Sequence, residues 1–236
     1  MRLGIMQPYF MPYLGYFALI REVDEFILFD TPQFIRHGWI ERNQVLKQNG
    51  ERLYIKVPLQ KHSRDTAIKD VVINNSQNWR QTILSQLGPY KKKAPFFKEV
   101  TNVLEEVFEL KSNSIVDLNL KALESVGTYL SIKTPFKVFS EMGLNIDDVN
   151  APDEWALNIC RALNANSYYN PTGGMEFFNR EKYQDAGIEL KFVKFEATPY
   201  DQLGNPFVPY LSVVDVMMFN SPEKINQMMN RISLLS

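Results

Sequence analysis

The chain has 236 residues, of which 45% are hydrophobic and 13% aromatic, so it can bury a substantial core. Glycine occurs 11 times and proline 13 times, close to average usage, which excludes collagen-like and low-complexity proteins. The formal net charge is −1, which argues against bulk nucleic-acid binding by the whole chain. We therefore expect a packed globular protein.

The chain has one cysteine, Cys160, and two histidines, His37 and His62. This excludes an internal disulfide and leaves too few soft ligands for a structural zinc ion. No apolar run approaches the roughly 18 residues of a membrane span, and the first residues lack the apolar core of a signal peptide. A cytoplasmic protein without a metal centre or membrane span is expected, and the residues identify no cofactor.

Positive charge is concentrated between residues 36 and 98, where thirteen Lys and Arg residues accompany four acids. A solvated basic face, compensated by acids elsewhere in the fold, would explain this bias. The alternative is that the segment meets an anion, either the phosphate of a small molecule or an RNA backbone.

The first thirty residues predict a Rossmann-like β-α-β unit. Residues 3–6 form a short apolar run, residues 13–20 carry apolar side chains at helical spacing, and residues 25–29 predict a second strand. A right-handed crossover of this length is typical of the start of a parallel sheet.

Strand and helix signals continue along the chain. Further strands are predicted at residues 52–57, 68–73, 136–139, 167–170 and 188–195. Helices are predicted after Ser76, Pro95, Ser114, Asp153 and Ser212, and again at residues 223–232. This order fits a single α/β domain over residues 1–236, with a mainly parallel sheet and a helical insert or subdomain around residues 76–131. Two lobes with a cleft between them are the alternative.

The loop from Met6 to Tyr16 follows the first predicted strand, which is where ligands bind in open α/β sheets. Gln7 and Tyr9 are therefore candidates for substrate contact, although the aromatic residues here would also suit a hydrophobic plug. Gly15 and Tyr16 fall where nucleotidyltransferases carry the Gly-His of their phosphate-binding motif. Tyrosine cannot replace imidazolium near neutral pH.

The segment from Asp30 to Asn43 is the second candidate site. Asp30 ends the second predicted strand, so its carboxylate is expected to project into the same crevice as the first loop. Arg42 can form two hydrogen bonds with a phosphate, and Trp39 offers a stacking plane. His37 could act as a general base that Asp30 orients. An exposed loop histidine and a core tryptophan are the alternatives.

Two later segments complete the candidates. Gly173 and Gly174 follow a predicted strand and could offer backbone N–H groups to an oxyanion, although a plain turn would have the same sequence. Ser212 and Asp215 begin a helix, where capping and complementarity to the helix dipole would explain both. Cys160 is expected in the core.

The chain lacks the motifs of α/β-hydrolases, zinc peptidases, P-loop proteins and dinucleotide-binding proteins.

These segments together resemble the WbqC-like family. The resemblance rests on the opening from Met6 to Phe17, on Asp-x-x-Gln-Phe at residues 30–34 and on Gly-Trp-x-x-Arg-Asn at residues 38–43. Later matches are Trp79, residues 90–95, Gly173-Gly174, Tyr200 with Gln202, and residues 209–215, so the likeness spans nearly the whole chain. The family is associated with O-antigen and related polysaccharide gene clusters, and some members have been proposed to be glycine transferases that acylate an amino sugar.

Together with the crevice expected to collect Gln7, Asp30 and Arg42, the resemblance suggests a cytoplasmic transferase that attaches an aminoacyl, for example glycyl, or other small acyl group to the amine of a nucleotide-linked sugar. Its candidate catalytic residues are Asp30 and His37, either of which would accept the amine proton. The candidate substrate-binding residues are Gln7, Tyr9, Gln33, Trp39, Arg42, Asn43, Gly173, Gly174, Tyr200, Gln202 and Asp215. In this hypothesis Arg42 holds the diphosphate and Trp39 or Tyr9 stacks on the base or sugar.

Two other classes stay open. The Gly15-Tyr16 pair suggests a nucleotidyltransferase or adenylate-forming enzyme, and the basic segment suggests a non-catalytic binder of sugar nucleotide or RNA. The transferase hypothesis requires the amino-terminal loop and the Trp39 segment to converge on one hollow.

Overall fold

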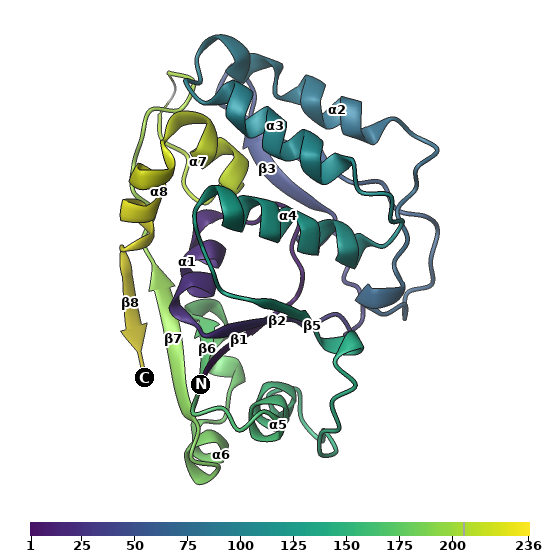
Figure 1. Ribbon diagram of the computed structural model, residues 1–236, viewed down its shortest axis with the longest axis vertical. Helices are drawn as coiled ribbons and strands as arrows, with labels where there is room; N and C mark the ends of the chain where they lie inside the picture. Colours follow the sequence, from purple (N-terminus) through teal and green to yellow (C-terminus); the bar gives the residue numbers. More distant parts are fainter. Residues whose placement is uncertain (205) are drawn as a thin grey trace.

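A six-stranded sheet in the order β5-β2-β1-β6-β7-β8 organises the computed structural model, which describes residues 1–204 and 206–236 (Figure 1). Its strands are β1 (Arg2–Met6), β2 (Glu25–Leu28), β5 (Phe136–Val138), β6 (Ser167–Pro171), β7 (Glu189–Phe195) and β8 (Ile232–Leu235). Every neighbouring pair in this sheet is parallel except β7 and β8. The predicted α/β class with a mainly parallel sheet is confirmed.

The sheet reverses its strand order between β1 and β6. Helix α1 (Leu14–Glu22) carries the chain from β1 to β2, whereas the chain returns much later to place β6 on the other side of β1. In open α/β sheets, ligands bind beyond the carboxyl ends of the strands at such a switch point. Here those ends are Met6 and Pro171.

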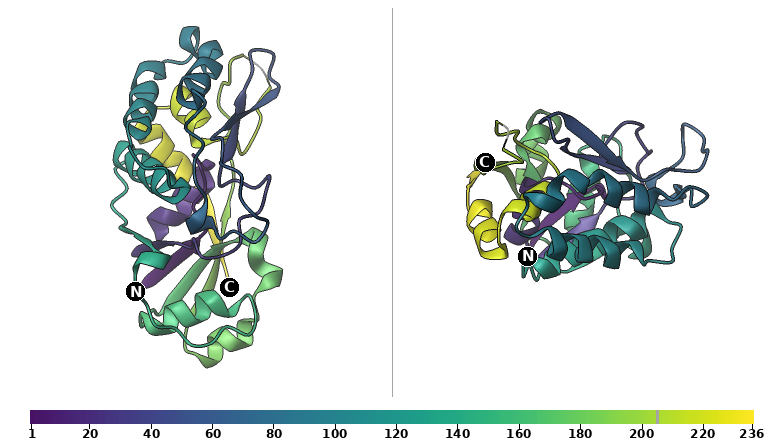
Figure 2. Two further views of the ribbon diagram at one scale, coloured as in Figure 1. Left: turned by 90° about the vertical axis from the view of Figure 1, so that its right-hand side faces the viewer. Right: turned by 90° about the horizontal axis from the view of Figure 1, so that it is seen from above.

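Helices cover both faces of the sheet (Figures 1 and 2). Because side chains alternate along a strand, Tyr168 of β6 joins a core with helices α5 (Glu154–Ala162) and α6 (Arg180–Asp185), while Tyr169 joins the core around α1. The second core also contains residues of α2 (Trp79–Gln86), α3 (Phe97–Phe108), α4 (Ile115–Tyr129), α7 (Val213–Phe219) and α8 (Pro222–Met229). Since the helical insert shares this core with α1, we propose that residues 1–236 form one domain.

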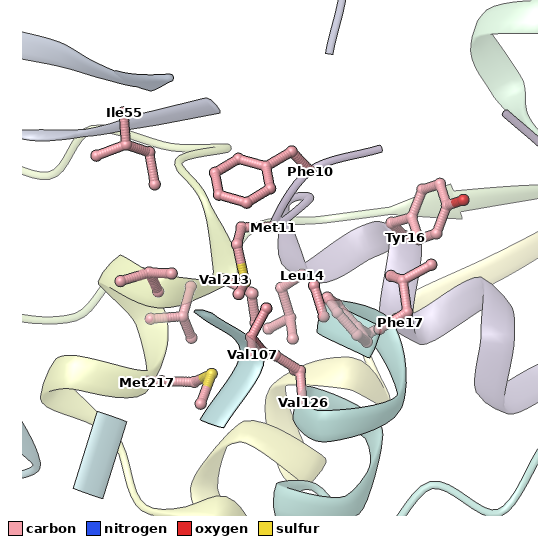
Figure 3. Packing of buried hydrophobic residues seen from close by; sticks show 14 of the residues in the cluster. Phe10, Met11, Leu14, Tyr16, Phe17, Ile55, Val107, Val126, Val213 and Met217 are labelled. Carbon is pink, nitrogen blue, oxygen red and sulfur yellow. The ribbon is translucent and has the colours of Figure 1, made fainter. Parts of the chain in front are cut away.

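The aromatic amino-terminal loop contributes much of that core. Phe10 and Phe17 are fully buried and Met11 is nearly so, and they pack with side chains of α4 and α7 (Figure 3). The hydrophobic-plug interpretation therefore holds for these three residues. Tyr9 and Tyr13 are only partly buried against this core.

Several local predictions are confirmed. The Ser114 hydroxyl accepts hydrogen bonds from the backbone N–H groups of Val116 (3.2 Å) and Asp117 (3.3 Å), which caps α4 as its sequence pattern predicts. Ser212 caps α7 through the N–H of Val214. Cys160 is fully buried, and this burial raises the pKa of its thiol to about 12.

Two predicted helix starts are wrong, those after Ser76 and Pro95, and the helix predicted after Asp153 starts where expected but without a side-chain cap bond. Helix α2 begins at Trp79, and the Ser76 hydroxyl instead bonds Asn74. Asp153 occupies the N-cap position of α5, but its carboxylate accepts from the Asn179 N–H at 3.2 Å and contacts Lys182. Helix α3 begins two residues after Pro95.

Strand assignments also differ from the predictions. An antiparallel hairpin joins β3 (Arg42–Leu46) to β4 (Arg52–Lys56), although β3 lies in a segment whose sequence shows no strand alternation. The expected strand at residues 68–73 is a short 3-10 helix with isolated bridges, because Val71 bonds back to Ile68. Helix α8 ends at Met229, before the predicted end at residue 232, and residues 232–235 form β8, an unpredicted strand that pairs with β7. The 3-10 helices are η1 (Ile68–Asp70), η2 (Gly88–Lys92), η3 (Phe139–Glu141) and η4 (Thr172–Phe177).

None of the helices in the described ranges is both long enough and apolar enough to span a bilayer.

Asp215 lies at the centre of a buried polar network. Tyr90, Tyr200 and Gln202 all donate to its carboxylate, with distances of 2.5 Å from Tyr200 and 2.9 Å from Gln202. The Tyr90 hydroxyl in turn accepts from the backbone N–H of Leu46 at 2.8 Å. Burial raises the pKa of Asp215, while the three donors act in the opposite direction. This network ties α7 to β3, η2 and the loop after β7.

We predict that Asp215→Ala destabilises the fold by about 3–5 kcal/mol, because three buried donors lose their acceptor at once. Tyr200→Phe removes the hydrogen bond that the hydroxyl donates to Asp215 and the one that it accepts from Gln202, and should cost about 1–2 kcal/mol because the Gln202 amide keeps other acceptors. Urea denaturation followed by circular dichroism measures both free energies. An Asp215→Ala protein as stable as wild type would contradict the structural role.

Candidate functional site

A hollow of about 560 Å³ lies at the carboxyl ends of β1, β6 and β7. We call it the switch-point hollow, because the sheet reverses its order between β1 and β6. Its walls come from the amino-terminal loop, the Trp39 segment, the end of β6 with the start of η4, the end of β7 and Tyr210. The lining residues are Met6, Tyr9, Pro12, Tyr13, Trp39, Asn43, Asn170, Pro171, Thr172, Gly173, Gly174, Val193, Phe195 and Tyr210.

Aromatic rings form much of the wall. Tyr13 packs edge-on against Phe195 and Tyr210, with ring centroids 6.3 and 6.1 Å apart. The side chains of Trp39 and Tyr210 stay 41% and 56% exposed, so both can cover a bound ring. Such half-exposed aromatic planes are suited to stacking on a nucleobase or the apolar face of a sugar.

One backbone hydrogen bond brings the two expected segments together. The N–H of Phe10 donates to the carbonyl of Trp39 at 2.9 Å. The Asn43 amide adds a second tie, since its Nδ2 donates to the Phe10 carbonyl at 3.2 Å. The amino-terminal loop and the Trp39 segment therefore converge on one hollow.

Asn170 is the polar group best placed to recognise a ligand there. It lies near the end of β6, lines the hollow and is 9% exposed. No hydrogen bond joins its side-chain amide to another described residue, in contrast to the amide of Asn43, whose oxygen also accepts from Gln44 N–H. The NH₂ group of such a free amide can donate a hydrogen bond to a ligand, and its oxygen can accept one.

The hollow contains no acid, lysine, arginine or histidine among the described residues that line it. Burial raises the pKa of Tyr9, and it raises that of Tyr13 to about 12. These phenols therefore stay protonated near neutral pH and serve as hydrogen-bonding groups. The chemistry that this wall can supply is stacking, hydrogen bonding and orientation, not proton abstraction.

Five of the predicted site residues meet at this hollow: Tyr9, Trp39, Asn43, Gly173 and Gly174. The others lie elsewhere. Gln7 lines a hollow of about 330 Å³ together with Phe29 and Trp155, which belong to the α5 face of the sheet. Tyr200, Gln202 and Asp215 form the buried network described above.

Two predicted residues hold loops in place. Arg42 donates to the backbone carbonyls of His37 and Gly38, and its guanidinium lies 4.3 Å from the centre of the Tyr54 ring. The Gln33 amide donates to the Arg64 carbonyl at 2.8 Å. Neither residue lines the switch-point hollow.

The expectation that the Asp30 carboxylate opens into the crevice of the first loop is wrong. Asp30 is 1% exposed, and its two oxygens accept from the Ser140 N–H (3.0 Å) and hydroxyl (2.5 Å). The reason is topological: β5 lies beside β2, so the turn after β5 reaches the end of β2 first. His37 has a positive φ of 66° and lines a different hollow.

Sequence reasoning omitted Tyr13, Asn170, Phe195 and Tyr210 as binding residues. Asn170 directly precedes the Pro-Thr-Gly-Gly turn, and this position could have identified it as a candidate binding residue. Phe195 and Tyr210 reach the hollow only because β7 lies next to β6 and because Tyr210 lies against Tyr13.

The Gly15-Tyr16 pair has a packing explanation. A Cβ at residue 15 would lie 2.3 Å from the Tyr13 ring and 2.9 Å from the Phe195 ring, so only glycine fits beneath these two walls of the hollow. Tyr16 is fully buried and donates to the Gln7 carbonyl at 2.8 Å. The pair therefore lends no support to a nucleotidyltransferase motif.

The fold and this hollow define an α/β protein with a hollow lined by aromatic side chains at the switch point of a mostly parallel sheet. The chain belongs to the WbqC-like protein family, whose model matches residues 7–227.

A relative of this chain is the uncharacterized protein Rv1507c of Mycobacterium tuberculosis (strain ATCC 25618 / H37Rv). The two are 25% identical over 222 residues, which is 93% of each protein. No solved structure matches this chain.

We predict that Gly15→Ala destabilises the protein by about 1–3 kcal/mol, because the added methyl group must displace the Tyr13 or Phe195 ring. Gly88→Ala is the matched control, since a Cβ at residue 88 meets no atom within 4 Å. Thermal unfolding of the three proteins measures the difference. Equal stability of the two variants would show that the Tyr13 and Phe195 rings move aside without lowering the free energy of unfolding.

Proposed function

We propose that this protein binds a nucleotide-linked amino sugar in the switch-point hollow and transfers an aminoacyl or other small acyl group to the amine of that sugar. The observation that carries the proposal is the hollow itself, where several aromatic side chains and a free amide, that of Asn170, line the switch point of the sheet. Family membership supports the role in surface polysaccharide synthesis that the resemblance implies.

The rings favour a ligand with flat or apolar faces. Trp39 and Tyr210 have exposed surface beside the more buried Tyr13, so a base or sugar can contact several aromatic groups at once. The Asn170 amide would then form hydrogen bonds with one donor and one acceptor on the edge of the bound base or sugar. The diphosphate would extend toward solvent, because the lining has no cationic side chain in the described part of the chain.

Acyl transfer to an amine suits a site that orients its reactants. The neutral amine attacks the acyl carbonyl, a C–N bond forms, the bond from the acyl carbon to its carrier breaks, and the amine proton leaves with the carrier or to water. Holding the two reactants at attacking distance lowers the entropic part of the barrier. In this proposal the backbone N–H groups of Gly173 and Gly174 steady the oxyanion that forms on the acyl oxygen.

The test is incubation of the purified protein with a panel of nucleotide-linked amino sugars and activated acyl donors, including glycyl donors. Mass spectrometry should show the mass of the transferred acyl group on one sugar nucleotide and not on its N-acetylated counterpart. If no pair yields a mass increase while a sugar nucleotide still binds in calorimetry, the hollow is a binding site without this transfer activity.

We predict that Asn170→Ala weakens binding of the sugar nucleotide found in that panel by about 10-fold, as expected for the loss of one or two hydrogen bonds. Asn102→Ala, at an exposed position of α3, is the matched control and should bind like wild type. Isothermal titration calorimetry measures both affinities. Wild-type affinity in Asn170→Ala would place the ligand elsewhere.

A further inference from the structure

A second hollow, of about 520 Å³, lies between the Trp39 segment, β4 and the start of α2. We call it the Glu41 hollow. Its charged and titratable lining consists of Glu41, Arg36, Lys56, Lys61, His37 and His62. The switch-point hollow shares none of these residues.

Glu41 is buried without a partner. The residue is 3% exposed, and its Oε2 is sealed from solvent with no hydrogen-bond donor within the described residues. It forms no ion pair with any of them either, although basic side chains line the same hollow. A buried carboxylate without a donor costs free energy, so a native protein seldom retains one unless a partner binds there.

The cationic side chains of this hollow also form no ion pairs with described residues. Arg36, Lys56 and Lys61 are exposed, and no described acid lies within ion-pairing distance of any of them. The Phe34 and Trp79 side chains line the same hollow. The hollow therefore offers one buried anion and three exposed cations to the same occupant.

These charges select the chemistry of the ligand. A plain phosphate would satisfy the cations but would be repelled by Glu41, and a plain amine would pair with Glu41 but would be repelled by the cations. A divalent metal ion prefers several oxygen ligands, and Glu41 is the single carboxylate in the lining described by the structure. A molecule with an ammonium group and an anionic group satisfies both halves.

The balance of charge favours a phosphate monoester over a carboxylate as the anionic group. Once the ammonium group pairs with Glu41, Arg36, Lys56 and Lys61 remain for the anionic group, and a monoester near pH 7.5, with close to two negative charges, offsets more of their charge than a carboxylate with one. We propose that the Glu41 hollow is a second ligand site that takes a small amino phosphate, whose ammonium group donates to Glu41 while its phosphate meets Lys56, Lys61 and Arg36. This inference concerns a different hollow and does not depend on the proposed function.

Isothermal titration calorimetry at pH 7.5 and low salt tests this proposal with probes that differ by one group. Glucosamine 6-phosphate and phosphoethanolamine carry both groups, glucose 6-phosphate lacks the amine, and glucosamine lacks the phosphate. At least one of the first two should bind about 10-fold or more tightly than both single-group probes. No binding by either amino phosphate, or equal binding of glucose 6-phosphate, would overturn the proposal.

Glycerophosphoethanolamine distinguishes a free monoester from a lipid headgroup, which has the same amine but a phosphodiester. We expect it to bind more weakly than phosphoethanolamine because it carries one negative charge less. Tighter binding of the diester would overturn the assignment to a small monoester.

Variants separate the two halves of the site. Glu41→Gln should lower the affinity for the amino phosphate about 10-fold, to that of glucose 6-phosphate, whereas Lys61→Gln should weaken both phosphate probes alike. Glu124→Gln, at an exposed position of α4 outside the hollow, is the matched control and should bind like wild type.

The unfolding temperature of Glu41→Gln adds a readout that does not need a ligand. Removing an unpaired buried charge should leave this temperature equal or higher than that of wild type. A lower unfolding temperature together with unchanged affinity for glucosamine 6-phosphate would assign Glu41 a purely structural role and overturn the proposal.

Discussion

The parallel pairing of β1 with β6 is the constraint on which the rest of the structure depends. It places Leu3 beside Tyr168 and Gly4 beside Tyr169, and thereby brings the amino-terminal loop next to the turn after β6. On the other side of β1, Gly4 permits close packing against β2, since a Cβ at this position would lie 2.7 Å from the Phe26 ring. Without the pairing of β1 with β6, the loop after β1 and the Gly173-Gly174 turn would not share a hollow, and the sheet would have no switch point at this place.

The segment from residue 36 to 43 is a partition between two hollows. Trp39 and Asn43 line the switch-point hollow, whereas His37 and Glu41 line the Glu41 hollow. Arg42 fixes the partition by donating to two backbone carbonyls within it. The polar and aromatic residues of this segment, which the sequence predicts to form one site, therefore line two chemically different hollows. The switch-point hollow is mainly aromatic, and the Glu41 hollow is charged.

The partners of buried polar groups distinguish framework from candidate site. Asp30 and Asp215 have donors on both carboxylate oxygens, and these contacts join elements that are distant in sequence. Asn170 and Glu41 are also largely buried, yet their side chains lack hydrogen-bond partners within the described chain. Burial and polarity alone describe all four residues, and only the contacts separate them.

The sequence by itself determined the α/β class, the opening β-α-β unit, the cap of α4 and the importance of the aromatic loop, because periodicity, capping and strand-end position are local properties. It also placed Tyr9, Trp39, Asn43, Gly173 and Gly174 in candidate segments. Only the tertiary structure decided which segments meet: that β5 borders β2 and encloses Asp30, that Tyr200 and Gln202 turn inward to Asp215, and that Asn170 lines the switch-point hollow. Strand order depends on contacts between residues far apart in the chain, which no local pattern encodes.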